Sequence, residues 1–101
     1  MHIKYAKTFW QQLIGLMFLR KNKFNYALIF TLPKESIKDA ILHTWFVFFR
    51  IDIAFFNANK ELVDYRENVR PFSLIKPSQL TKTIIELPAG QLQDFLKEYY
   101  G

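Results

Sequence analysis

The main apolar stretch of the chain covers residues 41–57, with the sequence ILHTWFVFFRIDIAFFN, and the polar side chains His43, Thr44, Arg50 and Asp52 are set into it. Because successive side chains of a strand point to opposite faces, these residues divide into two sets. One set holds Trp45, Val47, Phe49, Ile51, Ile53 and Phe55, and the other holds Thr44, Phe46, Phe48, Arg50, Asp52, Ala54 and Phe56. Strands commonly span about 5–6 residues, so this run is too long for one. We expect two strands, at about residues 41–47 and 51–57, with a bend or bulge near residues 48–50.

Four further segments have the apolar or alternating composition of strands. They are residues 2–6, 26–32, 61–69 and 83–87. Pro33 is expected to end the second of them. Residues 57–60 have the composition of a turn, because Asn tolerates positive φ and bonds its own backbone, and this turn predicts a hairpin. The polar segments 33–39 and 70–82 are predicted connections.

Two segments show the spacing of an amphipathic helix, with apolar residues at i, i+3, i+4 and i+7. They are Trp10, Leu13, Ile14 and Met17 near the N-terminus, and Leu92, Phe95, Leu96 and Tyr99 near the C-terminus. Thr8 and Gln11 form a capping box at the start of the first segment. Both apolar stripes are predicted to face the core.

The composition is that of a single globular domain covering residues 1–101. The hydrophobic content is 50% and the charged content is 23%, which argues against a disordered chain. Cysteine is absent. Its absence excludes disulfides and every metal, redox or nucleophilic site that is built on a thiol.

The formal net charge of +5 is concentrated near the N-terminus. Residues 1–34 carry six basic and no acidic side chains, whereas the rest of the chain carries eight basic and nine acidic ones. A basic segment attracts phosphates, which makes nucleic-acid binding an alternative function. Its candidate residues are Lys4, Lys7, Arg20, Lys21 and Lys23. These residues also fit a solvated surface beside the negative end of a helix, and we favour that interpretation.

No segment has the features of a membrane span or a secretion signal. The apolar runs are strand-sized, and none reaches the roughly 18 residues that a spanning helix needs. The first residues, MHIKYAKTF, lack the basic, apolar and small-residue regions of a signal peptide. We expect a cytoplasmic location and no membrane partner.

Three motifs, in this order, resemble a family described as domain of unknown function 192. The first runs from Thr8-Phe9-Trp10 to Gly15-Leu16-Met17. The second is HTWFVFFRIDI at residues 43–53, which is similar to the central motif of the family, although Arg50 stands where the family commonly has Pro. The third is IELPAG at residues 85–90. Together they extend the resemblance over nearly the whole chain.

The resemblance implies a fold and leaves the activity open. It implies a small α+β domain with a curved, mostly antiparallel sheet. With the elements above, the expected architecture is a five- to six-stranded, partly barrel-like sheet with one N-terminal and one C-terminal helix. The family has no established activity, so the resemblance assigns no function.

Three polar side chains are expected to lie against the core, namely His43, Asp52 and Glu86. A carboxylate in such a place is costly to bury unless it is paired, and Arg50 on the same strand face is a suitable partner. We favour a structural ion pair that fixes the bend. The alternative is a polar pocket for a small anionic or polar ligand. Its residues would be His43, Thr44, Arg50, Asp52 and Glu86.

The sequence lacks recognisable catalytic motifs. No serine lies in a nucleophile elbow, no glycine-rich phosphate loop is present, and no metal-ligand spacing occurs. We therefore expect no cofactor and no metal ion. An acid–base pair of His43 with Asp52 or Glu86 leaves a hydrolase-type activity open as an alternative.

The favoured function is a non-enzymatic ligand-binding or protein-interaction module. Phe46, Phe48 and Phe56 lie on the strand face opposite the uniformly apolar one. If two helices leave these rings exposed, they provide a surface for a homodimer or another partner.

Overall fold

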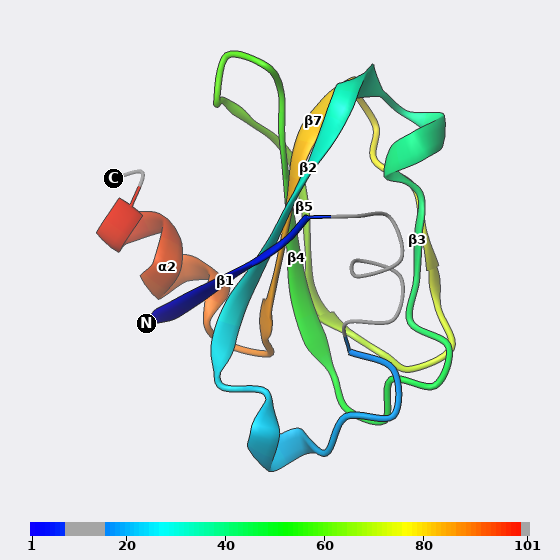
Figure 1. The fold of residues 1–101 in the computed structure, drawn as a ribbon, viewed down its shortest axis with the longest axis vertical. Coiled ribbons are helices and arrows are strands. Elements are labelled where there is room, and N and C mark those ends of the chain that lie inside the picture. The colour runs from blue at the N-terminus through cyan, green and yellow to red at the C-terminus, as the bar shows by residue number, and fades with distance from the viewer. Residues whose placement is uncertain (8–15, 100–101) are drawn as a thin grey trace.

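A five-stranded sheet forms the body of the molecule (Figure 1). The computed structural model describes residues 1–7 and 16–99 of the chain. In spatial order the strands are β1 (His2–Ala6), β2 (Tyr26–Ser36), β7 (Thr81–Pro88), β4 (Ile51–Phe56) and β5 (Leu62–Val69). β1 is parallel to β2, and the other pairs are antiparallel. The sheet is therefore mixed, and mostly antiparallel as predicted.

The two faces of the sheet are covered differently (Figure 1). On one side lies a short ribbon of β3 (Leu42–His43) and β6 (Leu74–Ile75), together with the 3-10 turn η2 (Lys38–Ala40). On the other side lies the helix α2 (Leu92–Tyr99). A second 3-10 turn, η1 (Lys21–Lys23), precedes β2 at the lower end in Figure 1.

The alternation of side chains along the strands divides the core into two clusters. The larger cluster includes Leu28, Phe30, Ile51, Ile53, Phe55 and Ile84, covered by Leu42, Val47 and Phe49. The smaller cluster lies under α2 and consists of Ala27, Ala54, Phe56, Ile85, Leu87, Leu92 and Phe95. The predicted division of residues 51–56 between two faces is confirmed. The C-terminal helix is confirmed too, with Leu92 and Phe95 buried against the sheet.

The first half of the central run is where the strand prediction is wrong. The expected strand at residues 41–47 is reduced to the two residues of β3, which pair with β6 rather than continuing into the main sheet. The backbone turns instead, because the amide of Val47 donates to the carbonyl of Thr44 (3.2 Å) and Phe46 has a φ of 62°. The bend therefore extends over residues 44–50, and the second predicted strand is confirmed as β4.

One connection differs from the sequence prediction, and another agrees with it. Pro33 does not end β2, which continues to Ser36, but the pairing with β7 is irregular between Thr31 and Ser36. A proline has no amide to donate, so it fits where the ladder is interrupted. The predicted hairpin is confirmed, and Asn57 Oδ1 accepts hydrogen bonds from the amides of Asn59 and Glu61 in its turn (2.9 and 3.0 Å).

Two further expectations concern the outline of the fold. Most of the expected N-terminal helix, residues 8–15, lies outside the described residues, and residues 16–18 form a bend and a turn. The partly barrel-like closure is wrong, because β1 and β5 lie at opposite edges of the sheet and do not pair with each other.

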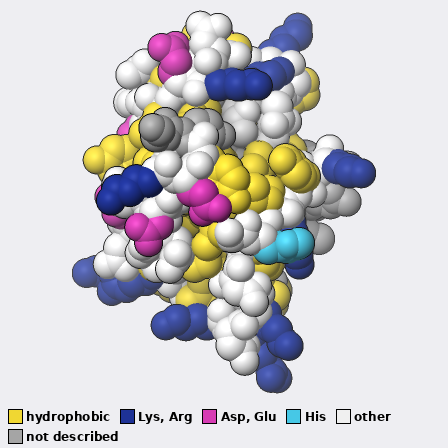
Figure 2. Space-filling model, turned by 90° about the vertical axis from the view of Figure 1, so that its left-hand side faces the viewer, with side chains coloured by type: hydrophobic (Ala, Val, Ile, Leu, Met, Phe, Trp, Pro, Cys, Tyr) yellow, Lys and Arg dark blue, Asp and Glu magenta, His cyan; other side chains and the backbone are white. Residues whose placement is uncertain are grey.

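Figure 2 shows the side of the molecule that carries α2. Hydrophobic side chains gather in the middle of this side, and Lys and Arg side chains lie around them and at the lower end, where no Asp or Glu is visible. Among residues 1–7 and 16–99, no helix has the length and apolar character that crossing a membrane requires.

Candidate functional site

Asp52 is completely buried and its carboxylate is fully used by backbone amides. Its Oδ1 accepts from the amide of Asn68 (2.8 Å), and its Oδ2 accepts from the amides of Gly90 and Leu92 (3.0 Å each). Leu92 is the first residue of α2, whose first amides have no partner inside the helix. The negative charge also faces the positive end of the helix. Asp52 therefore joins β4 to the start of α2.

The amide of Asn68, one of the three that donate to Asp52, belongs to a bulge in β5. Ile51 pairs with Val69 but Ile53 pairs with Arg66, so β5 has one residue more than β4 over this stretch. Asn68 takes up the difference with a φ of 56°, a conformation that Asn tolerates better than most residues. Asp52 fixes this bulge and makes no ion pair with Arg50, so the predicted structural pair is replaced by bonds to amides.

Thr44 is also buried, and it joins two loops. Its hydroxyl donates to the carbonyl of Arg70 (2.8 Å) and accepts from the amide of Ser73 (2.8 Å). The amide of Thr44 donates to the carbonyl of Ser73 (2.9 Å), and its carbonyl accepts from the amide of Phe72 (3.0 Å). With its polar groups occupied in this way, Thr44 holds residues 44–50 against residues 70–73.

His43 and Glu86 lie in separate surroundings. The His43 ring stacks on Trp45, with 4.9 Å between the ring centroids, and its Nδ1 is buried without a hydrogen-bond partner among the described residues. Glu86 is buried in the middle of β7, on the face that holds Ile84. Burial, and secondly the charge of Glu86, raise the pKa of the Tyr26 hydroxyl.

Arg50 is exposed and lines a pocket of about 540 Å³ at the lower end of the sheet. We call it the basic pocket. Its lining consists of Lys21, Phe24, Phe48, Phe49, Arg50, Asn68, Pro71, Pro88 and Ala89. Of the five predicted site residues it includes Arg50 alone, while Asp52 supports its wall through the amide of Asn68. Aromatic rings and two cations thus meet in one concave surface.

The family to which this fold and motif set belongs is identified by direct comparison. A profile of DUF192, described as an uncharacterised ACR, matches residues 1–96. The chain belongs to the DUF192 family. It is 38% identical to a UPF0127 protein of Thermococcus sibiricus, over 98% of this chain and 62% of that protein. It is 36% identical to a UPF0127 protein of Pyrococcus furiosus, over 90% of this chain and 75% of that protein.

Two solved structures share the fold of this DUF192 domain. A candidate transcription regulator from Sinorhizobium meliloti superposes with a TM-score of 0.79, and a protein of unknown function from Novosphingobium aromaticivorans superposes with 0.72. The two alignments cover 92% and 91% of this chain and 72% and 66% of those chains. Both are 19% identical to it, so they support the fold alone.

The basic residues predicted for nucleic-acid binding do not share one site in the DUF192 domain. Lys4 lies over the ring of Tyr26, with 4.2 Å between its Nζ and the ring centroid. Lys7 lines a different pocket, of about 520 Å³, beside Lys38 and Asp39. Arg20, Lys21 and Lys23 lie in or next to η1, and Lys21 reaches the basic pocket.

The three phenylalanines predicted to be exposed divide into two groups. Phe46 and Phe48 are exposed, but Phe56 is 2% exposed, so that part of the prediction is wrong. The reason is α2, which covers the second face of the sheet at this point. Two exposed rings, Phe18 and Phe72, were not predicted, although an apolar residue inside a polar loop is a visible signal for Phe72.

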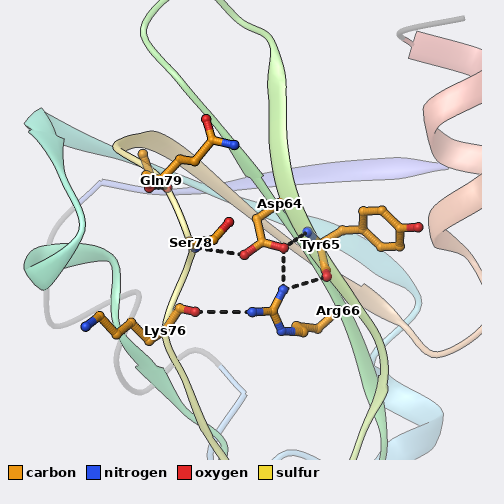
Figure 3. Close-up of polar contacts among 7 residues, drawn as sticks. Asp64, Tyr65, Arg66, Lys76, Ser78 and Gln79 are labelled. Carbon is orange, nitrogen blue, oxygen red and sulfur yellow. Dashed lines mark hydrogen bonds and ion pairs between the residues drawn. The ribbon is translucent and has the colours of Figure 1, made fainter.

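A polar network on β5 was also missed by the sequence interpretation (Figure 3). The Asp64 carboxylate accepts from the amides of Tyr65 and Ser78 (2.8 Å each) and pairs with the Arg66 guanidinium, which also donates to the carbonyl of Lys76 (3.3 Å). Burial alone would raise the pKa of Asp64, but the bonds from Arg66, Ser78 and Tyr65 outweigh it and hold this pKa below its ordinary value. The network attaches residues 76–78 to the edge of the sheet.

Proposed function

We propose that this DUF192 domain is a non-enzymatic binding module whose basic pocket takes a small anionic ligand with an apolar part. The observation that supports this proposal is the lining of the pocket, in which Lys21 and Arg50 stand beside Phe24, Phe48 and Phe49 without any Asp or Glu. A cytoplasmic location, as expected from the sequence, is part of the same proposal.

The two cations are available to a ligand. Neither Lys21 nor Arg50 forms an ion pair with any described residue. Arg is suited to carboxylate and phosphate groups, because its guanidinium donates two parallel hydrogen bonds. Ligand pockets in proteins are typically concave and largely apolar with a few polar groups that orient the ligand, and the basic pocket has this character.

The other predicted site residues have supporting roles in this proposal. Asp52 and Thr44 spend their polar groups on backbone partners, so they position the pocket walls rather than contact the ligand. His43 and Glu86 do not line the basic pocket. An acid–base pair of His43 with either carboxylate finds no support in these positions, which favours binding over hydrolysis.

The first test is calorimetric titration with phenyl phosphate and with inorganic phosphate. Phenyl phosphate should bind more tightly, because its ring contacts the pocket phenylalanines. Arg50→Gln and Lys21→Gln should each weaken it by about tenfold, equivalent to about 1.4 kcal/mol. Lys97→Gln, on the exposed face of α2, is the control and should change nothing. If both pocket variants bind as tightly as the wild type, the ligand site lies elsewhere.

Nucleic-acid binding is the second candidate. The basic surface around η1 favours it, and one structural neighbour is named as a candidate transcription regulator. Affinity for single-stranded DNA or RNA would then fall steeply with salt, because phosphate contacts release counterions. An absence of binding at low salt, measured by fluorescence anisotropy, would end this candidate.

A further inference from the structure

Four exposed phenylalanines form one cluster at the lower end of the molecule. They are Phe18, Phe46, Phe48 and Phe72, with exposed fractions between 43% and 68%. Phe18 stacks on Phe46 with 5.0 Å between ring centroids, and Phe72 meets the edges of Phe46 and Phe48 at 5.9 and 6.1 Å. A monomer rarely exposes a contiguous apolar patch without a use for it. We call these four residues the phenylalanine cluster.

The cluster is held in place by its backbone. Its rings come from three loops that are far apart in the sequence. The amide of Phe18 donates to the carbonyl of Phe46 (2.7 Å), and the amide of Phe72 donates to the carbonyl of Thr44 (3.0 Å). The rings are therefore brought together by hydrogen bonds between the loops, before any partner is present.

Three members of the cluster have a backbone conformation that Phe rarely adopts. The φ angles of Phe18, Phe46 and Phe72 are 61°, 62° and 59°. This left-handed region costs a residue with a Cβ roughly 1–2 kcal/mol, and Gly or Asn is the usual occupant. Burial of the ring would offset that cost, but these rings are exposed. Neither the backbone conformation nor burial in the core therefore favours Phe at these three positions.

The charged side chains of the same loops are all positive. Each loop places an arginine two residues from a phenylalanine, in the pairs Phe18 and Arg20, Phe48 and Arg50, and Phe72 and Arg70. Residues 16–25, 44–50 and 69–76 contain six Lys and Arg and no Asp or Glu. An apolar cluster is thus bordered by cations.

The positive charge around the phenylalanine cluster distinguishes among the partners that the cluster could bind. A second copy of the chain would bring Arg20, Arg50 and Arg70 close to the same residues of its partner, which is unfavourable. A single-stranded nucleic acid needs open ring faces for its bases, but Phe18 and Phe46 stack on each other, and Phe72 packs edge to face with Phe46 and Phe48. An anionic bilayer fits both features, since apolar side chains enter the interface while cations contact the phosphates.

We propose that the phenylalanine cluster docks on the surface of a bilayer that contains anionic lipids, with Arg20, Arg50 and Arg70 at the level of the phosphates. The contact is peripheral and requires no spanning segment. It reverses the expectation of no membrane partner, which rested on the lack of a long apolar helix. It shares Phe48 and Arg50 with the basic pocket, but Phe18, Phe46 and Phe72 do not line that pocket, so variants of these three residues test the lipid contact separately.

The test is co-sedimentation with vesicles of phosphatidylcholine alone and of phosphatidylcholine mixed with phosphatidylglycerol. The wild type should bind the mixed vesicles, and added salt should weaken the binding. Phe18→Ser and Phe72→Ser should each lower the partition coefficient by about tenfold, through lost apolar burial. Arg70→Gln should lower it by about fivefold, since one cation contributes about 1 kcal/mol at such a surface.

The control is Leu80→Ser, which removes an exposed apolar residue next to β7, at the end opposite Pro88, and should leave the partition coefficient unchanged. Thermal unfolding checks that each variant is folded, which we expect because the replaced rings are exposed. Equal binding to both kinds of vesicle, or no binding, would overturn the proposal. Phe18→Ser should still bind phenyl phosphate, so failure of the lipid contact is separable from failure of the basic pocket.

Discussion

At the scale of single residues, Asp52 shows how a polar group in an apolar run can be structural. Its carboxylate accepts three backbone amides from two separate elements, and it is completely buried. A buried polar group is costly unless it is hydrogen-bonded, and the three amides meet that requirement. The residue that looked like a pocket ligand is therefore part of the support for the pocket.

Asp52→Asn should lower the free energy of unfolding by about 3 kcal/mol. The substitution replaces one carboxylate oxygen with an NH₂ group, which cannot accept a hydrogen bond, so the backbone amides on that side lose their partner. Urea unfolding at neutral pH measures this change. Asp94→Asn, in the first turn of α2, is the matched control and should cost less than about 1 kcal/mol. Unchanged stability together with lost phenyl phosphate binding would show that Asp52 acts on the ligand instead.

At the scale of elements, the sequence predicted what side-chain periodicity can encode. The hairpin of β4 and β5, the last strand and the C-terminal helix follow from alternation, from Asn57 and from the spacing of Leu92 and Phe95. The short extent of β3 does not follow from periodicity. Residues 44–49 have the apolar composition of a buried strand, but the backbone is bent there by hydrogen bonds to Ser73 and Phe72. Such long-range partners leave no local signal.

The candidate site was less predictable than the fold, for the same reason. Arg50 was identified, and Phe48 and Phe49 precede it in the sequence. The rest of the basic pocket comes from distant segments, namely residues 21–24, 68–71 and 88–89. Their proximity depends on the order of the strands, which periodicity does not specify. Phe18 illustrates the point, since its contact with Phe46 joins residues from two loops far apart in the sequence.

The hydrogen bonds of Asp64 and Arg66 link β5 to residues 76–78, and they predict how the stability of the fold depends on pH. The pKa of Asp64 is lower in the folded protein than its ordinary value of 3.8. The stabilisation is therefore complete above that value and is lost as the pH falls below it, through the folded pKa. Asp64→Asn should cost about 2 kcal/mol at pH 7 and progressively less in acid.

Urea unfolding of the wild type and Asp64→Asn across this pH range measures the difference. Asp39→Asn, which changes an exposed carboxyl in η2, serves as the control. A difference between wild type and Asp64→Asn that stays constant down to pH 2 would mean that the bonds do not depend on the charge of Asp64.

At the scale of the whole molecule, the same cations that favour a lipid surface oppose self-association. We expect sedimentation velocity to give a monomer at physiological salt, even at high protein concentration. High salt screens the arginines, so any dimer formed through the phenylalanine cluster should appear there first and should be absent in Phe72→Ser. A stable dimer at low salt would contradict the charge argument and would restore the homodimer as the occupant of this surface.

The position of β7 has a consequence for folding during synthesis on the ribosome. β7 lies between β2 and β4, so the pairs β1–β2 and β4–β5 have no shared neighbour until residues 81–88 emerge from the ribosome. Until then the nascent chain carries two half-sheets with open edges, which are templates for pairing with other chains. A protein whose synthesis stopped before residue 81 would expose both edges together with the apolar faces that β7 completes. Chaperones should therefore bind this intermediate more readily than the finished domain.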